Sequence, residues 1–343
     1  FYAIVASIIA FIPAFFYILP LIFLDRYDPE PPWLIAAAFA WGGIVAVVFS
    51  FIVNTTIGQF IFSATGDPGI ANLTSTVISA PVFEELSKGI GVVILLIFFR
   101  REFDDILDGI VYGGVIGLGF ATVENVLYYG QQYSGGLEAV SFLFLLRGVL
   151  SPFIHSTFTA MTGIGCGIAR ESHNLAIRLL APIGGYIIAV ILHMIWNGVL
   201  ATLAPILYVV LFGADPKDSW KGFVIAYCLL AIPFFLICAG FCYYIMRRQN
   251  RILREMLAID TARGLITDEQ LKTVTSVFKS TAWLLDGITS GKYRARSRFL
   301  RSVGKLGLSY WHIHRATAAQ GQTGSFQSNP VFRAEVEKWR MQI

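Results

Sequence analysis

Long apolar runs that recur along the chain constrain its fold more than any other feature. A helix needs about 20 apolar residues to cross the hydrocarbon core of a bilayer, and turn-rich or charged segments separate about seven runs of that length. We expect these runs to be membrane spans; they are 1–24, 33–55, 76–99, 106–129, 147–169, 180–203 and 222–246. Charged residues make up only 14% of the chain. The sequence therefore predicts an all-α fold, a polytopic transmembrane helical bundle.

Charge divides the chain into two regions. Residues 251–343 hold 15 of the 26 Lys and Arg but only 7 of the 22 Asp and Glu, whereas the part before them has more acids than bases. We expect a transmembrane domain over 1–248 and a basic, helical tail over 249–343. The run 1–24 has no small-residue cleavage site after it, so it is interpreted as a first span and not as a signal peptide.

Cations between the spans predict the orientation of the chain. Arg100-Arg101, Arg170 with Arg178, and Arg247-Arg248 follow the third, fifth and seventh spans, which alternation places on one side of the membrane. By the positive-inside rule that side is the cytoplasm. We therefore expect a multi-pass protein of the cell membrane with its amino terminus outside and its tail in the cytoplasm.

Polar residues inside four of the spans share a similar depth. At a rise of about 1.5 Å per residue, the predicted topology places all of them in the outer half of the membrane. We expect them to meet in one site, and they are Glu84, Glu85, Glu124, His155, His193 and Asn197. Lys88, one helical turn from Glu84, belongs to the same predicted site.

The paired carboxylates are the strongest indication of function among these residues. A lone histidine in a span is more often a hydrogen-bond partner between helices than a catalyst. Two adjacent buried carboxylates, by contrast, cost several kcal/mol unless a partner or a raised pKa relieves them. Lys88 lies one helical turn after Glu84 and can neutralise one glutamate. The other glutamate of the pair Glu84-Glu85 is then free to titrate.

A stripe of small residues precedes Glu124. Gly109, Gly113 and Gly117 recur at intervals of four, which allows a neighbouring helix to approach closely. We interpret this stripe as scaffold for the site.

Together these motifs resemble those of the PrsW family of intramembrane proteases, part of a wider superfamily with the CAAX prenyl endopeptidases and bacteriocin-processing proteins. The resemblance covers roughly residues 10 to 245 and leaves the tail out. The segments that carry it are 25–31, 83–88, 108–113, 119–125, His155 and 193–197.

The resemblance implies hydrolysis of a peptide bond in a membrane-spanning protein substrate. It assigns Glu84, Glu85 and Lys88 to an EExxK-type motif and Glu124 to an FxxxE-type motif, and the two histidine motifs bring His155 and His193 with Asn197. The best-known activity of the family is the first cut in an anti-sigma factor, on its extracytoplasmic side. An outer-half site agrees with such a cut.

Two mechanisms fit these residues. In the first, Glu84 or Glu85 acts as the base without a metal, while the histidines and Asn197 polarise the carbonyl or the water. Sequence does not rank the two glutamates. In the second, Glu84, Glu124, His155 and His193 bind zinc and leave a position open for water. The absence of an HExxH helix and the presence of Lys88 favour the first mechanism, so no cofactor is expected and zinc is the alternative.

Two other classes of protein remain as alternatives. Intramembrane Glu and His residues also serve as proton relays in proton-coupled transporters or channels. Transporters often contain internal repeats, with related segments in the two halves of the chain. The EExxK segment has no second copy in this chain, which argues against a transporter. A protease-related protein that binds a partner without cleaving it would use the same residues. Changing both Glu84 and Glu85 to Gln separates these classes from a protease.

The tail shows two further patterns. Thr267 to Gln270 has the form of a helix capping box, which indicates a helical hairpin. Residues 292–305 hold six cations and no acid, so we expect them to contact anionic lipid headgroups of the bilayer, and we expect no nucleic acid as a partner. The stretch 317–329, rich in Gln, Ser, Gly and Thr, predicts a flexible linker.

Overall fold

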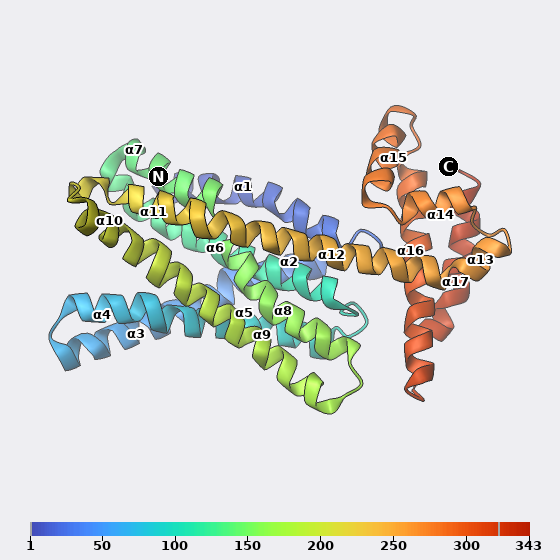
Figure 1. The fold of residues 1–343 in the computed structure, drawn as a ribbon, viewed down its shortest axis with the longest axis horizontal. Coiled ribbons are helices and arrows are strands. Elements are labelled where there is room, and N and C mark those ends of the chain that lie inside the picture. The colour runs from blue at the N-terminus through green and yellow to red at the C-terminus, as the bar shows by residue number, and fades with distance from the viewer. Residues whose placement is uncertain (1, 322) are drawn as a thin grey trace. The chain divides into compact units, whose positions relative to one another are not determined.

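The computed structural model describes residues 2–321 and 323–343, and all regular structure among them is helical. Phe1, in the first predicted span, and Gln322, in the predicted linker, lie outside the described residues. The chain forms two compact units. Unit 1 contains the chain up to Phe23 and Glu30–Ala239, and unit 2 contains Leu24–Pro29 and Gly240–Ile343. The helices are labelled in Figure 1.

Among the described residues, six helices are long and apolar enough to cross a membrane, which confirms the predicted polytopic bundle. All except α1 extend beyond the apolar runs from which they were predicted, and several join two numbered helices through a π-helical turn. The first five are α1 (Tyr2–Leu24), α2 to α3 (Pro32–Thr65), α6 (Ile106–Gln132), α7 to α8 (Gly136–Glu171) and α9 to α10 (Leu175–Phe212). The sixth, Pro216–Met256, contains α11 (Trp220–Ala226) and α12 (Ile232–Met256).

The run predicted as the third span is also helical. It lies in a continuous helix built from α4 (Pro68–Thr74), a π-helical segment (Ser75–Ser79) and α5 (Ala80–Phe98). Its acids and its lysine make this helix less apolar than the other six, so composition alone does not identify it as a span. Its passage through the membrane stays a prediction.

After the second predicted span the chain makes a tight turn between α3 (Val47–Thr65) and α4. Gly66 ends α3 in the left-handed conformation, with φ of 69°, which glycine adopts without steric cost. Asp67 then caps α4 by accepting hydrogen bonds from the N–H groups of Gly69 and Ile70, and Pro68 occupies the first turn. These signals explain why both helices run up to the turn.

Large apolar side chains cover the outside of unit 1. Phe15 on α1 is 68% exposed, Phe60 on α3 is 74% exposed, and Leu211 on α10 is 71% exposed. A protein surrounded by water rarely exposes so many large apolar groups. The surface is the one expected for helices in contact with lipid.

Helix α6 is the buried centre of unit 1, and glycines allow α8 (Ile154–Glu171) to lie against it (Figure 1). A Cβ added to Gly163 would lie 1.8 Å from the carbonyl oxygen of Gly109, and a Cβ added to Gly117 would lie 2.3 Å from that of His155. The two backbones are therefore in direct contact. This confirms the scaffold predicted from the glycine stripe.

Changing Gly163 to Val should destabilise unit 1 by about 1–3 kcal/mol or more, because backbone cannot give way as a flexible side chain can. We expect a lower unfolding temperature for the purified protein in detergent. The matched control is Gly184→Val on α9 (Leu175–Ile195), where a Cβ meets nothing within 4 Å. Equal unfolding temperatures for the two variants would contradict the close contact of α6 with α8.

Unit 2 has a hydrophobic core of its own. Its helices are α13 (Ala258–Ala262), α14 (Asp268–Val274), α15 (Val277–Thr289), α16 (Tyr293–Ala318) and α17 (Ser325–Arg340). Thr267 and Gln270 form the predicted capping box at the start of α14. Helix α17 begins inside the stretch predicted as a linker, because Val336 is fully buried in the core and Phe332 and Trp339 pack against it. Helix α16 also extends to Ala318, so the linker prediction is wrong for residues 317–318 and 325–329.

Candidate active site

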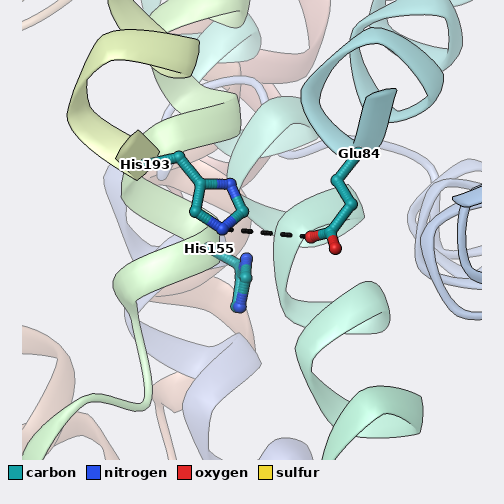
Figure 2. Close-up of side chains that lie close together, drawn as sticks. All are labelled: Glu84, His155 and His193. Carbon is teal, nitrogen blue, oxygen red and sulfur yellow. Dashed lines mark ion pairs between the residues drawn. The ribbon is translucent and has the colours of Figure 1, made fainter. Parts of the chain in front are cut away.

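Four helices of unit 1 bring six of the seven predicted site residues together. Helix α5 carries Glu84, Glu85 and Lys88; Glu124 comes from α6, His155 from α8 and His193 from α9. All except Glu124 are buried, and the side chain of Glu124 is 18% exposed. Figure 2 shows Glu84, His155 and His193 facing one another.

Glu85 uses both of its oxygens for contacts inside the protein. Its Oε1 accepts a hydrogen bond of 2.6 Å from Lys88 Nζ and lies 3.0 Å from Nδ1 of His193. Its Oε2 accepts a hydrogen bond of 3.0 Å from Thr159. A carboxylate with charge-assisted bonds on each side is well compensated for its burial. Glu85 therefore orients Lys88 and His193.

Glu84 differs from its neighbour because one of its oxygens lacks a hydrogen bond. Its Oε2 is buried, and the nearest cationic or imidazole atoms are Lys88 Nζ at 3.7 Å and His193 Nε2 at 3.9 Å. The second contact is the dashed line in Figure 2. A buried oxygen without a partner is costly and needs an explanation such as a bound ion. The geometry thus separates two glutamates that sequence did not rank.

His155 lies between Glu124 and Lys88. Its Nε2 is 3.1 Å from Glu124 Oε2, and its Nδ1 is 3.2 Å from Lys88 Nζ. The imidazole rings of His155 and His193 have centroids 5.0 Å apart. Pro152 lies in a short irregular turn at 151–153 that separates α8 from the preceding helical segment, and His155 stands in the first turn of α8.

Arg147 is a member of the cluster that sequence reasoning missed. It forms an ion pair with Glu124 and donates a hydrogen bond of 2.7 Å to Asn125 Oδ1. Arg147 lies in the π-helical segment Leu145–Leu150. The signal that could have found it is a single arginine within an otherwise apolar run, since such a charge needs a partner.

Asn197 lies apart from the contacts of the cluster. Its side chain donates a hydrogen bond of 2.9 Å to the carbonyl oxygen of Thr76. In an α-helix, Asn197 would share a face with His193, but the helix becomes π-helical from Trp196 to Leu203. The hydrogen bond ties Asn197 to Thr76 in the π-helical segment Ser75–Ser79, and not to a residue of the cluster.

Glu84, His155 and His193 form a group that could hold a metal ion such as zinc. Each offers one ligand atom, and these atoms all lie within 4.8 Å of one another. The unpartnered oxygen of Glu84 fits this role, and the contact of His193 Nδ1 with Glu85 leaves Nε2 available, as in many zinc sites. Glu124, the fourth ligand of the predicted set, lies outside this group and pairs with Arg147.

The charge balance also permits a cation. The cluster contains three carboxylates, from Glu84, Glu85 and Glu124, against the two cations of Lys88 and Arg147. With neutral histidines its formal charge is negative. Lys88, which the sequence suggested would oppose a metal, is already neutralised by Glu85 at 2.6 Å.

A buried cluster of carboxylates and histidines within apolar helices is the arrangement of an intramembrane hydrolytic enzyme, and the comparisons with known proteins agree. The family described as "PrsW family intramembrane metalloprotease" matches residues 30–237. The chain belongs to the PrsW family and is an intramembrane protease. The family predicted from the motifs is thereby confirmed.

Curated relatives support the same assignment. Protease PrsW of Oceanobacillus iheyensis is 26% identical over 238 residues, which cover 68% of this chain and 91% of the relative. Protease PrsW of Bacillus subtilis is 27% identical over 187 residues, which cover 54% of this chain and 78% of the relative. No solved structure is significantly similar to the chain.

Proposed function

We propose that this protein is a metal-dependent endopeptidase that cleaves a membrane-spanning protein substrate, with Glu84, His155 and His193 as the metal ligands. The observation that carries the proposal is the buried oxygen of Glu84, which has no hydrogen bond and faces two histidines. The family description as a metalloprotease supports it too. Both favour the zinc alternative over the metal-free mechanism preferred from sequence.

The other residues of the cluster position these ligands. A bound zinc ion supplies a Lewis acid and lowers the pKa of water. Glu85, itself held by Thr159 and Lys88, fixes the ring of His193. Glu124, held by Arg147, contacts Nε2 of His155. A metal would then take Nδ1 of His155, and Lys88 Nζ, 3.2 Å away, would give up its contact with that nitrogen. Lys88 is the ammonium group nearest to Glu84 and would stabilise the negative charge that develops on the carbonyl oxygen of the scissile bond.

We infer further that the amino terminus lies outside, the tail lies in the cytoplasm, and the cut falls near the extracytoplasmic face. Arg170 donates hydrogen bonds to the carbonyl oxygens of Phe103 and Arg100, so the loop after α5 and the end of α8 lie at the same end of unit 1. This supports the alternation on which the topology rests. Regulated proteolysis of an anti-sigma-factor type is the role that best suits such a cut.

Cleavage of single-span reporters by the purified protein in lipid vesicles tests the proposal. We expect the wild type to cut, a chelator to stop the reaction, and added zinc to restore it. His193→Ala should be inactive under all three conditions, because it removes one ligand and leaves Glu85 without its imidazole partner.

Three outcomes would contradict parts of the proposal. Cleavage that a chelator leaves unchanged but His193→Ala abolishes would point to the metal-free mechanism with Glu84 as base. Cleavage that survives in His193→Ala would mean that the site lies elsewhere. Stoichiometric binding of a reporter without a cut would favour the non-catalytic alternative.

A further inference from the structure

Unit 2 contains a cavity of about 290 Å³ that lies outside the protease site. One wall is the last part of α12, and the other is the connection from α14 to α15 together with the first residues of α15. The residues that carry its chemistry are Tyr243, Arg247, Arg251, Arg254, Ser276 and Phe278. The volume is close to the lower end of the range for small-molecule sites, so it suits a small ligand or a headgroup.

Three arginines give the cavity its charge. Arg247, Arg251 and Arg254 follow one another at spacings of four and three, so they share one face of α12. Arg254 is fixed by hydrogen bonds from Nε to Thr275 Oγ1 at 2.7 Å and from Nη2 to the carbonyl oxygen of Thr275 at 3.0 Å. The residues that line this cavity include no carboxylate. The site is therefore complementary to an anion.

The opposite wall adds donors of the same kind. Ser276 caps α15 by accepting a hydrogen bond from the N–H of Lys279, and Val277 and Phe278 in the first turn also line the cavity. The first N–H groups of a helix generally lack partners within the helix, and the helix dipole favours a negative charge there. Guanidinium groups and a helix amino terminus together match a phosphate group.

Aromatic side chains stand beside the arginines. Phe278 is 75% exposed and Tyr243 is 41% exposed, and their rings lie 6.4 Å apart. Both neighbour the point where the apolar part of α12 gives way to arginines. Aromatic and basic residues at the end of a membrane span are typical of the interface with lipid headgroups.

The segment predicted to contact lipid, residues 292–305, is less available than its sequence suggests. Arg296 forms an ion pair with Asp286 at 2.7 Å and donates a hydrogen bond to the carbonyl oxygen of Trp283. Lys305 forms an ion pair with Asp28 at 2.7 Å. Two of its six cations are thus used inside unit 2, whereas Arg247 and Arg251 line an open cavity.

We propose that this cavity is a binding site for a phosphate group, with Arg247, Arg251 and Arg254 as its ligands. The exposed aromatic residues and the adjoining span make an anionic phospholipid headgroup the expected source of that phosphate. The site is separate from peptide-bond cleavage and does not depend on the proposed function.

Native mass spectrometry of the full-length protein in neutral detergent tests the proposal. The probes are short-chain phosphatidylglycerol and phosphatidylcholine, each with and without inorganic phosphate as competitor. The pocket variant is Arg247→Gln with Arg251→Gln, two exposed arginines. The matched control is Arg294→Gln with Arg298→Gln, two exposed arginines of α16 outside the cavity. Unfolding temperatures show whether each variant is folded.

We expect wild type to retain one phosphatidylglycerol molecule and the pocket variant to bind it roughly 30-fold more weakly, since each cation near a headgroup contributes about 1 kcal/mol. The control should bind phosphatidylglycerol as tightly as wild type does. Arg251→Lys, which keeps the charge, should bind it more weakly than wild type and more tightly than the pocket variant. Displacement of the lipid by inorganic phosphate would support the phosphate site with a soluble source, and no displacement would support the lipid source. Equal loss in the pocket variant and the control, or no retained lipid and no effect of phosphate, would overturn the proposal.

Discussion

Glu84→Gln should lower the rate of reporter cleavage by about 1,000-fold or more while the protein stays folded. Glutamine has nearly the shape of glutamate but carries no charge, so it is a poor metal ligand and a poor base. The change also removes a buried carboxylate oxygen that makes no hydrogen bond, so we expect little loss of stability. The rate constant at saturating reporter is the quantity to measure, together with the metal content of the purified variant.

Glu138→Gln is the matched control for this prediction. Glu138 is an exposed acid in the first turn of α7 (Gly136–Phe144) and is not one of the residues of the cluster. It should cleave the reporter at the wild-type rate. A Glu84→Gln protein that retained more than a tenth of the wild-type rate would show that Glu84 neither binds the metal nor takes up a proton.

Lys88→Met should destabilise the protein by about 3–5 kcal/mol, because it leaves the carboxylates of Glu84 and Glu85 buried without their cation. Lys88 is fully buried and lies 2.6 Å from Glu85 and 3.7 Å from Glu84. Its ammonium also lies 3.9 Å from the ring centroid of Phe120, a cation–π contact that methionine would lose. A lower unfolding temperature in detergent is the expected result.

A double variant shows whether charge or packing is responsible. In Lys88→Met with Glu85→Gln, no uncompensated charge remains at that pair, so part of the stability should return. Lys279→Met, at an exposed lysine of α15, should unfold as wild type does. If Lys88→Met is no less stable than the Lys279→Met control, the buried ion pair contributes nothing to the fold.

The sequence was sufficient for the parts of the fold that follow from local patterns. Apolar runs located the helices of unit 1. The capping box at Thr267 and Gln270 was predicted in the same way, because a capping box is a signal within four positions. The polar composition of residues 325–329 predicted a flexible linker, but these residues form the start of α17. The reason is that α17 is held by Val336 in the core of unit 2, a contact remote from the polar stretch.

In the candidate site, too, patterns in the sequence predicted part of the arrangement, and contacts between helices determine the rest. Polar residues of similar depth predicted that Glu84, Glu85, Lys88, Glu124, His155 and His193 would meet, and they do so in unit 1. The ranking of Glu84 and Glu85 depends on Thr159, which comes from another helix and satisfies only one of them. The position of Asn197 depends on a hydrogen bond to the backbone of Thr76, a contact with another helix that spacing along the chain does not reveal.

The direct contact between the backbones of α6 and α8 limits how a substrate can enter. Gly109 and Gly163 leave no space through which one helix could slide or rotate against the other. Glu124 and His155 stand on these two helices, so they form a fixed wall. A membrane-spanning substrate of the kind proposed above would therefore reach the candidate site by displacing helices other than this pair. Cross-linking α6 to α8 should leave turnover intact, and a lateral gate should be sought among the remaining helices.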